Sequence, residues 1–270
     1  MKLIKTVLII FAVIAIVSCK TDDNTDDSSA TDTTDANYFP ITIGSNWTYT
    51  IDTDGQDPQE DALFVAGTQE SDGNTYTDIE SNDEPFGFVT GILESNLLRT
   101  VDYQLLVKGM IGAPIDGFPG IMIELEDFIM FDASVSSGQL DAITGLIEQN
   151  VEGIPLEFEY GFKTVGLPAS SSLSVNGVVY NDVVNTSFVL TLAVTAQIEV
   201  GGFVIPFPIL SQQDVLTGTA SFAKETGFIM GESTVDYELE DLSGLGIELP
   251  FPSEATTLTL ETITNFEIGN

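Results

Sequence analysis

Short runs of β-forming residues, separated by Gly, Pro, Asn and Asp, occupy the chain from Tyr38 to its end. Residues 47–51 (W-T-Y-T-I) alternate with a period of two, and much of 188–200 does the same. Because successive side chains of a strand point to opposite faces, this period predicts half-buried strands. Trp47, the sole tryptophan, is expected to anchor the core, because a sugar-binding platform normally needs several exposed aromatic residues.

Turn-forming residues predict two hairpins. Asn176-Gly177 is a pair suited to a type I′ turn, and residues 224–227 provide a longer connection. The runs that should form strands beside these turns, and near the C-terminus, are 171–175, 178–182, 214–223, 228–239 and 256–266.

Helical spacing is convincing in one place. Leu140, Ile143 and Ile147 follow a pair of serines that could cap a helix, and they predict one short helix. We therefore expect a single domain over residues 38–270 that is mainly β: a curved antiparallel sheet, or a partly closed half-barrel, with one short helix.

The N-terminus has the three zones of a secretion signal. Lys2 and Lys5 supply positive charge, residues 3–17 are apolar, and Cys19 follows. The apolar zone is shorter than the roughly 20 residues that a membrane span needs, so a retained membrane helix is the less favoured alternative. We expect residues 1–18 to be a cleaved signal peptide.

Cys19 is the only cysteine, so no intrachain disulfide can brace the fold. Ile16-Val17-Ser18-Cys19 resembles the lipobox of bacterial lipoproteins, with Ile at a position where Leu is more usual. The resemblance implies that the thiol receives a diacylglycerol and becomes the new N-terminus. Two or more acyl chains anchor a protein stably at a membrane, which it does not span.

Residues 19–37 are rich in Asp, Thr, Ser and Asn, which predicts an acidic disordered tether. Its start, Lys20-Thr21-Asp22-Asp23, resembles the short acidic export signals that send some lipoproteins to the outer face of the outer membrane. We expect an outer-membrane location at the cell surface, with the periplasmic face of that membrane as the alternative.

Acidic residues dominate the expected mature chain. Without Lys2 and Lys5, five basic residues stand against 42 acidic ones, a formal net charge of −37. Such a field repels nucleic acid and anionic head groups, so nucleic-acid binding is set aside. Hydrophobic residues still make up 43% of the chain, which is enough for a sizeable core.

The sequence contains no histidine, which excludes Ser-His-Asp and Cys-His catalysis and makes a His- or Cys-bound zinc centre untenable. No Gly-rich phosphate-binding loop is present, and no cofactor is expected. Carboxylate chemistry remains, since a glycosidase needs two carboxylates at a set separation. With 42 acidic residues, however, pairs arise by number alone, and solvation of a strand face explains them better. The acids considered are Glu124, Glu126, Asp127, Glu157 and Glu159.

An acidic turn follows the first expected strand. Asp52, Asp54 and Asp57 surround Gly55 with the oxygen density that calcium favours, but this glycine is fourth in the run, whereas an EF-hand loop has glycine sixth. An acidic hairpin turn is the simpler interpretation, and structural calcium is the alternative.

Proline-containing apolar stretches recur at residues 202–208 (G-F-V-I-P-F-P) and 246–252 (G-I-E-L-P-F-P), with related chemistry at 117–121. Proline interrupts sheet ladders, so these stretches should be edges or loops. They could rim a hydrophobic pocket or dock a partner, or they could fold over the open end of the core. The side chains that would form the binding site are Phe203, Ile205, Phe207, Leu249 and Phe251.

Phe39-Pro40-Ile41 with Gly44, Trp47 and Tyr49 resembles the F-P-[LI]-x-x-G-x-x-W-x-Y opening of a broad group of uncharacterised bacterial outer-membrane lipoproteins. Segments 175–183 and 222–229 are similar to later hairpins of that group, whereas residues 109–170 show no match. The group is similar to the curved half-barrel lipoprotein carriers of the periplasm, which hold acyl chains in a concave sheet.

Three classes of function follow from these observations. The favoured one is a lipid-anchored, non-enzymatic lipoprotein whose β domain binds a hydrophobic small molecule or an envelope protein. A structural or adhesive surface protein is the second class, and a carboxylate-dependent hydrolase is the third. A deep apolar groove would favour the first, a flat closed sandwich the second, and two facing acids in a cleft the third.

Overall fold

The computed structural model describes residues 37–113, 121–151, 153–200, 202–242 and 252–269. All of these residues belong to one compact unit. The expected signal peptide, Cys19 and the tether up to residue 36 lie outside the described residues. The described elements are β1 (Asn46–Thr53), β2 (Gln59–Ser71), β3 (Asn74–Ser81), α1 (Phe88–Ser95), β4 (Leu97–Val101), β5 (Gln104–Gly112), β6 (Met122–Asp132), β7 (Gly138–Val151), β8 (Ile154–Val175), β9 (Val178–Val200), β10 (Phe203–Ala223), β11 (Gly227–Glu238) and β12 (Glu254–Glu267).

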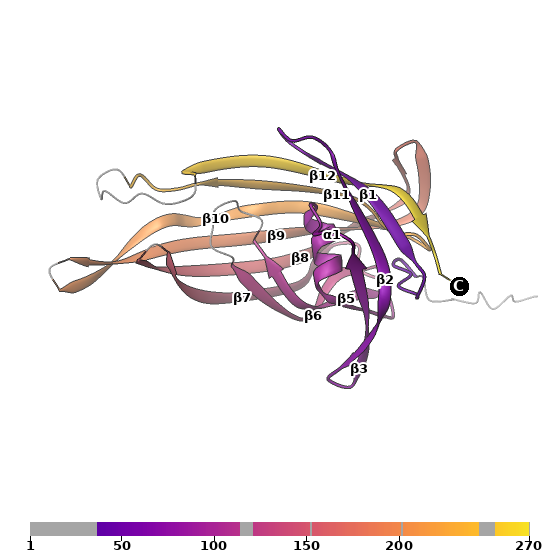
Figure 1. The fold of residues 1–270 in the computed structure, drawn as a ribbon, viewed down its shortest axis with the longest axis horizontal. Helices are drawn as coiled ribbons and strands as arrows, with labels where there is room; N and C mark the ends of the chain where they lie inside the picture. The colour runs from indigo at the N-terminus through magenta and orange to yellow at the C-terminus, as the bar shows by residue number, and fades with distance from the viewer. Residues whose placement is uncertain (1–36, 114–120, 152, 201, 243–251, 270) are drawn as a thin grey trace, which may run out of the picture. The chain divides into compact units, whose positions relative to one another are not determined.

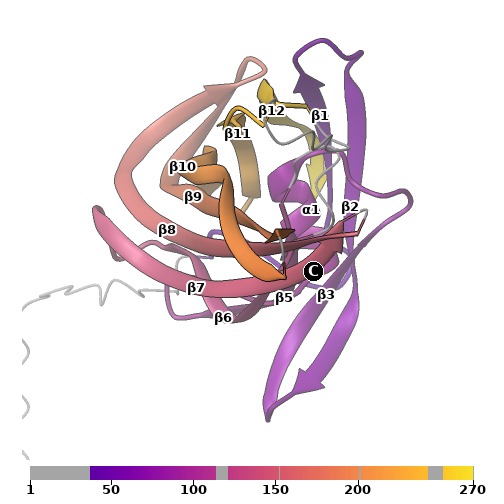
Figure 2. The same cartoon turned by 90° about the vertical axis from the view of Figure 1, so that its left-hand side faces the viewer.

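The strands form one antiparallel sheet in the order β6-β5-β4-β3-β2-β1-β12-β11-β10-β9-β8-β7. Neighbours in sequence are neighbours in the sheet, except that β6 and β7 are its two edges and β1 pairs with β12. The sheet is nearly closed into a barrel, with one unsealed seam (Figure 2). Near the seam, the Ile129 N–H donates to Asp141 at 3.1 Å, and the Thr164 hydroxyl donates to the Ile129 carbonyl at 2.6 Å. The expected mainly β, part-closed antiparallel fold is confirmed.

The two-residue periods of the sequence become inward and outward faces. In β1, Trp47, Tyr49 and Ile51 are buried in the core while the residues between them are partly exposed. Trp47 stacks on Phe39, and its indole N–H donates to the Thr226 carbonyl at 2.6 Å. The expectation that Trp47 anchors the core is confirmed.

Both predicted hairpins and the terminal strand are present. Asn176 and Gly177 join β8 to β9 with positive φ angles of 51° and 81°, as a type I′ turn requires. Residues 224–226 join β10 to β11, and β12 covers the predicted C-terminal run. These elements were predictable because turn residues and alternation act locally.

The predicted helix around Leu140–Ile147 is wrong, because residues 138–151 form strand β7, which pairs with β8. Ile143 and Ile147 are four residues apart, and this spacing places them on one face of either a helix or a strand. Along β7, more exposed and less exposed residues alternate with a period of two, as in a strand. The spacing of three residues between Leu140 and Ile143, which suggested a helix, is therefore a coincidence. The one short helix of the described residues is α1 instead.

Strands β8, β9 and β10 are much longer than the others, with 22, 23 and 21 residues, and they project past the shorter strands (Figure 1). The β11 partner of β10 begins only at Leu216, so β9 is the one strand among the described residues that pairs with residues 203–208, which include Pro206 and Pro208. These stretches were predicted to be edges or loops, and among the described residues this one is a strand edge. Residues 117–120 and 246–251 lie outside the described part of the chain.

Candidate functional site

Helix α1 begins beside a buried carboxylate from β2. Asp61, which is 3% exposed, accepts the N–H groups of Phe86 at 2.9 Å and Gly87 at 3.0 Å. The Thr90 hydroxyl donates to the same carboxylate at 2.6 Å. Asp61 thus fixes the segment that leads into the helix.

A second buried carboxylate, from β12, meets the first turn of the helix. Glu261 is fully buried and accepts the N–H groups of Val89 at 2.8 Å and Thr90 at 3.0 Å. Gly87 is the N-cap residue and supplies no capping side chain. The first free N–H groups of a helix need acceptors, and here two remote strands provide them.

Burial raises the pKa of Glu261 to about 7, because the charged form loses its hydration. The hydrogen bonds from Val89 and Thr90 oppose this rise, while the nearby Asp61 adds to it. The Thr90 hydroxyl lies 3.1 Å from a Glu261 oxygen as well as within hydrogen-bond distance of Asp61. The two acids and this hydroxyl form one hydrogen-bonded unit, which we call the acid pair.

The site needs glycine at position 87. A Cβ there would fall 2.3 Å from a Glu261 oxygen and 2.4 Å from the Thr90 hydroxyl. Only a residue without a side chain lets the strand carboxylate approach the backbone of the segment this closely.

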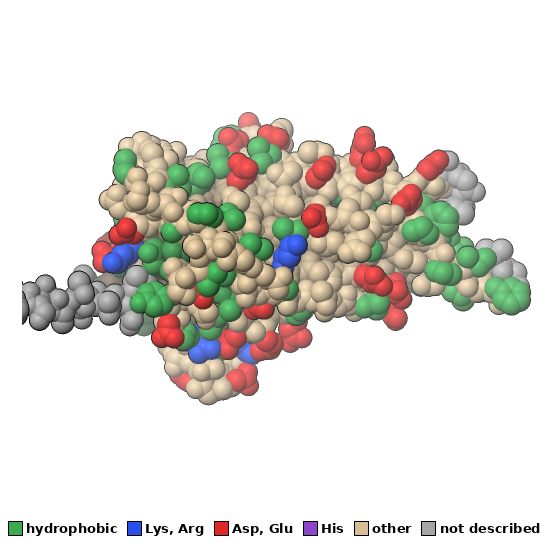
Figure 3. Space-filling model, turned by 180° about the vertical axis from the view of Figure 1, so that it is seen from behind, with side chains coloured by type: hydrophobic (Ala, Val, Ile, Leu, Met, Phe, Trp, Pro, Cys, Tyr) green, Lys and Arg blue, Asp and Glu red, His purple; other side chains and the backbone are tan. Residues whose placement is uncertain are grey.

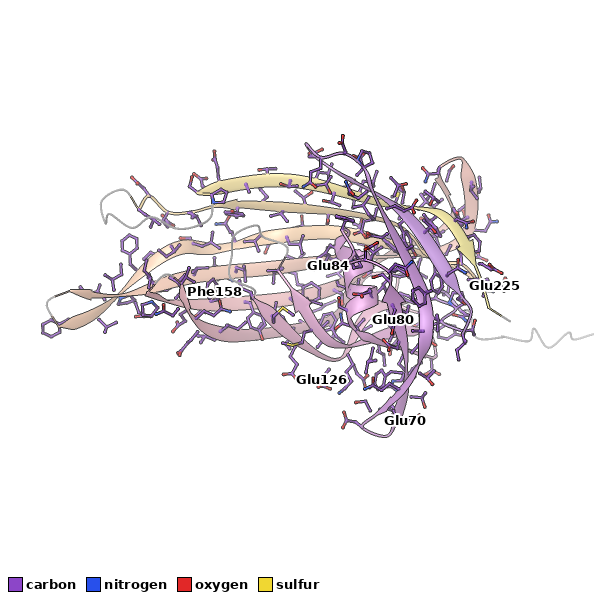
Figure 4. The ribbon with its side chains drawn as sticks, in the orientation of Figure 1. Glu70, Glu80, Glu84, Glu126, Phe158 and Glu225 are labelled. Atoms are coloured by element: carbon purple, nitrogen blue, oxygen red, sulfur yellow. The ribbon has the colours of Figure 1, made fainter. Side chains whose placement is uncertain are left out.

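Next to the acid pair, the inward face of β1, β11 and β12 is hollowed into a cleft of about 550 Å³, which we call the concave cleft. Its strand residues share the inward face with the buried Tyr49 and Glu261. The segment before α1 forms the opposite wall, and Glu84 marks its start in Figure 4. The lining residues are Ile51, Thr53, Gln56, Asp57, Gln59, Glu84, Pro85, Phe86, Phe88, Ser233, Val235, Tyr237, Pro252, Ala255, Thr257 and Thr259.

The concave cleft combines apolar surface with hydroxyl groups. Val235, Tyr237 and Phe88 contribute apolar surface, and the Phe88 ring lies 5.0 Å from the Phe188 ring in the core. Four of the lining residues are Thr or Ser, and none is Lys or Arg. Its two acids, Asp57 and Glu84, are both exposed. This lining suits a neutral apolar or amphipathic molecule better than an anion.

A second cleft, of about 380 Å³, lies against the same segment and α1. It shares Glu84, Pro85, Phe86 and Phe88 with the concave cleft. Phe86, Met110 and Met122 line it and are 56%, 45% and 46% exposed. Flexible Met side chains adapt to apolar ligands, so this second cleft extends the apolar surface around the segment.

Of the five apolar side chains singled out in the sequence, the three that the structure describes line neither cleft. Phe203 and Ile205 are 75% and 47% exposed at one end of β10. Phe207 is half-buried against the core, and Leu249 and Phe251 lie outside the described residues. Apart from Asp57, the cleft residues were missed, because most of them are Thr, Ser and isolated apolar residues of ordinary strands or belong to the short segment before α1.

The three acids proposed for calcium are not gathered. Asp52 and Asp54 are exposed, whereas Asp57 belongs to the lining of the concave cleft. No group of three acidic residues in the described part of the chain could hold a metal ion.

The carboxylates of β6 mainly face basic partners. Glu126 pairs with Lys108, which also pairs with Asp72 at 2.9 Å. Asp127 accepts a bond from Arg99 at 2.7 Å and another from the Tyr76 hydroxyl at 2.6 Å. Exposed Glu124, also in β6, lines neither cleft. These contacts account for Glu126 and Asp127 without catalysis.

Glu157 and Glu159 lie on the outward face of β8, opposite in parity to the buried Phe158. Glu159 and Lys163 border a depression of about 570 Å³ on the outside of β7–β10, where Gly161 and Ala193 leave room. It faces away from the core and from the acid pair. Among the described residues, no helix has both the length and the apolarity to cross a membrane.

No family model matches the chain, and no curated protein matches it. Among solved structures, a LolA superfamily protein from Nitrosomonas europaea aligns over 87% of this chain and 90% of that chain. The identity is 8% and the TM-score is 0.20, values at which the likeness does not establish a shared fold.

Proposed function

We propose that the described domain binds a neutral apolar or amphipathic small molecule in the concave cleft without converting it. The supporting observation is the cleft itself: about 550 Å³, walled by apolar side chains and hydroxyls, with no basic residue. Ligand pockets of proteins typically range over about 300–1,000 Å³ and combine apolar walls with a few polar groups.

The disposition of the acids favours binding over hydrolysis. A catalytic acid must reach the atom that it protonates, but Glu261 is fully buried and its two oxygens accept hydrogen bonds from α1. Asp61 is occupied in the same way. The acid pair holds the wall of the cleft and leaves ligand contact to other residues.

A cleft-filling variant tests the binding site. We expect a neutral fluorescent probe, N-phenylnaphthylamine, to bind the wild-type chain and to bind Thr257→Trp at least tenfold more weakly. Leu258→Trp is the matched control, because this neighbouring side chain points outward and is 37% exposed. Failure of the wild type to bind the probe, or equal binding by Thr257→Trp, would overturn the proposal.

The proposal includes a lipid anchor at Cys19 that holds the chain at the outer membrane, on the cell surface. The supporting observations are the charged and apolar zones of residues 1–18 and the position of the single cysteine. In a bacterial host, we expect labelled palmitate to enter the wild-type chain and not Cys19→Ala. Label in both chains, or in neither, would contradict the anchor.

A further inference from the structure

The end of β10 carries three consecutive exposed apolar side chains. Phe203, Val204 and Ile205 are 75%, 64% and 47% exposed. Since neighbouring side chains of a strand point to opposite faces, both faces of this strand end are apolar and open to solvent. A strand that packs on a core needs only one apolar face, so packing within the domain does not explain this set, which we call the apolar tip.

The apolar tip lies far from the point where the chain enters the domain. β10 extends from Phe203 to Ala223, about 65 Å for an extended strand. Just beyond Ala223, the Glu225 N–H donates to the Asn37 carbonyl at 2.7 Å. Figure 4 labels Glu225 at one end of the long strands, and Figure 3 shows hydrophobic side chains gathered at the other. The tip is therefore a projecting end rather than part of a cleft.

Proline argues against a partner strand at this edge. Pro206 and Pro208 follow the tip in the part of β10 that, within the described ranges of the chain, has only β9 as a partner. Proline lacks an N–H and is tolerated in a strand where its nitrogen faces away from the neighbour, which blunts the free edge. Addition of a strand from a second copy is disfavoured, because it would need backbone N–H donors along this edge. Contact with a lipid surface needs no backbone N–H donors.

The charge of the chain around the apolar tip indicates which kind of lipid surface it suits. Residues 178–223, which make up β9 and β10 with their turn, contain no Lys or Arg, and the chain as a whole has a formal net charge of −35. Anionic bilayers attract basic segments, and this tip has none. Its binding free energy would therefore come only from the insertion of apolar side chains, which favours a neutral bilayer for an acidic protein. We propose that the apolar tip, Phe203 with Val204 and Ile205, is a contact site for a neutral lipid bilayer.

A tryptophan placed at the tip reports contact directly. The full chain carrying Phe203→Trp is mixed with vesicles of brominated phosphatidylcholine, whose bromines quench tryptophan at the depth of the acyl chains. We expect the added emission to shift to shorter wavelength and to fall by at least half. The native Trp47 is 1% exposed and bonds to Thr226, near the other end of β10, so it provides a constant background.

Val179→Trp is the matched control. Val179 is 61% exposed on the β8–β9 hairpin, at the opposite end of β9. Its added emission should be unshifted and unquenched, even if the N-terminus holds the chain on the vesicle. Equal quenching at both positions, or quenching at position 179 alone, would overturn the proposal.

Two further arms complete the test. Adding Val204→Asp to Phe203→Trp should abolish the quenching, and replacing a third of the lipid by phosphatidylglycerol should weaken it. Retention of quenching in the Asp variant would contradict insertion of the tip. A shift of emission that follows protein concentration rather than lipid would identify a second copy as the occupant and would equally overturn the proposal.

Discussion

At the scale of single residues, two strand carboxylates replace the cap that α1 lacks. Asp61 and Glu261 come from β2 and β12, which are far apart in sequence, and meet at one helix end. Each buried oxygen has a backbone or hydroxyl donor, which offsets part of the cost of removing the acids from water. The wall of the concave cleft therefore depends on two side chains that lie beneath it.

Stability should fall as pH rises through the titration of Glu261. Its folded pKa is about 7 and its ordinary value 4.5, so between these values the folded state holds a proton that the unfolded state has lost. Unfolding then releases a proton, and the free energy of unfolding should decrease by about 1.4 kcal/mol per pH unit in this window. Urea titrations at pH 5, 6 and 7 measure this slope.

Glu261→Gln is the control, because an amide does not titrate here. This variant should lose the decrease in the free energy of unfolding with pH that Glu261 causes. At pH 5 its free energy of unfolding should be about 1 kcal/mol lower than that of the wild type, because one hydrogen bond to the helix is mismatched. An unchanged slope in this variant would show that another group carries the pH dependence.

Gly87 and Gly91 should respond to alanine in opposite directions. A Cβ on Gly87 would fall 2.3 Å from Glu261, whereas one on Gly91, within α1, meets nothing within 4 Å. Gly87→Ala should lower the free energy of unfolding by about 1–3 kcal/mol. Gly91→Ala should raise it by up to about 1 kcal/mol, because alanine is the better helix former. Equal effects in thermal unfolding would contradict the close approach at position 87.

Sequence alone predicted the role of Trp47 and missed that of the acid pair. A lone large aromatic residue in an alternating strand has one favourable place, the core. An acid in a strand normally indicates a solvated face, and nothing near Glu261 in sequence reveals the helix end that it meets. Only the three-dimensional pairing of β1 with β12 brings Glu261 to α1.

At the scale of elements, hairpins were predictable and the helix was not. The turn at Asn176-Gly177 is specified by two adjacent residues, and both have the positive φ that the turn requires. In contrast, α1 has eight residues and no capping side chain of its own, and it depends on remote strands. Isolated helices this short are unstable, so their local signal is weak.

The β8–β9 turn should be sensitive to loss of its second glycine. Gly177 has φ of 81°, and a Cβ added there would meet no atom within 4 Å, so backbone strain is the only penalty for alanine. Gly177→Ala should cost about 1 kcal/mol in urea unfolding. Gly67 is equally uncrowded but does not have a positive φ, so Gly67→Ala should change the free energy of unfolding far less. Equal losses would contradict the type I′ turn.

At the scale of the whole molecule, acidic charge is spread over a nearly closed sheet. The formal net charge is −35, and the ion pairs found among the described residues involve only Arg99 and Lys108. Self-repulsion should therefore outweigh attraction at low salt. The class of fold followed from alternation, but the β1–β12 junction joins residues about 200 positions apart and has no local signature.

Salt should stabilise this domain. Raising ionic strength from about 10 mM to about 300 mM shortens the screening length from about 30 Å to below 10 Å and weakens the repulsion. We expect the melting temperature to rise by several degrees with sodium chloride and to rise less with sucrose of equal osmolality. A falling melting temperature would show that surface ion pairs dominate instead.

The central claim is that the concave cleft holds an apolar ligand. Native mass spectrometry of the gently purified full chain tests it most directly. The account predicts a bound small molecule on the wild type and on Leu258→Trp, and its loss from Thr257→Trp. A wild-type chain without bound mass, or the same bound mass on Thr257→Trp, would contradict it.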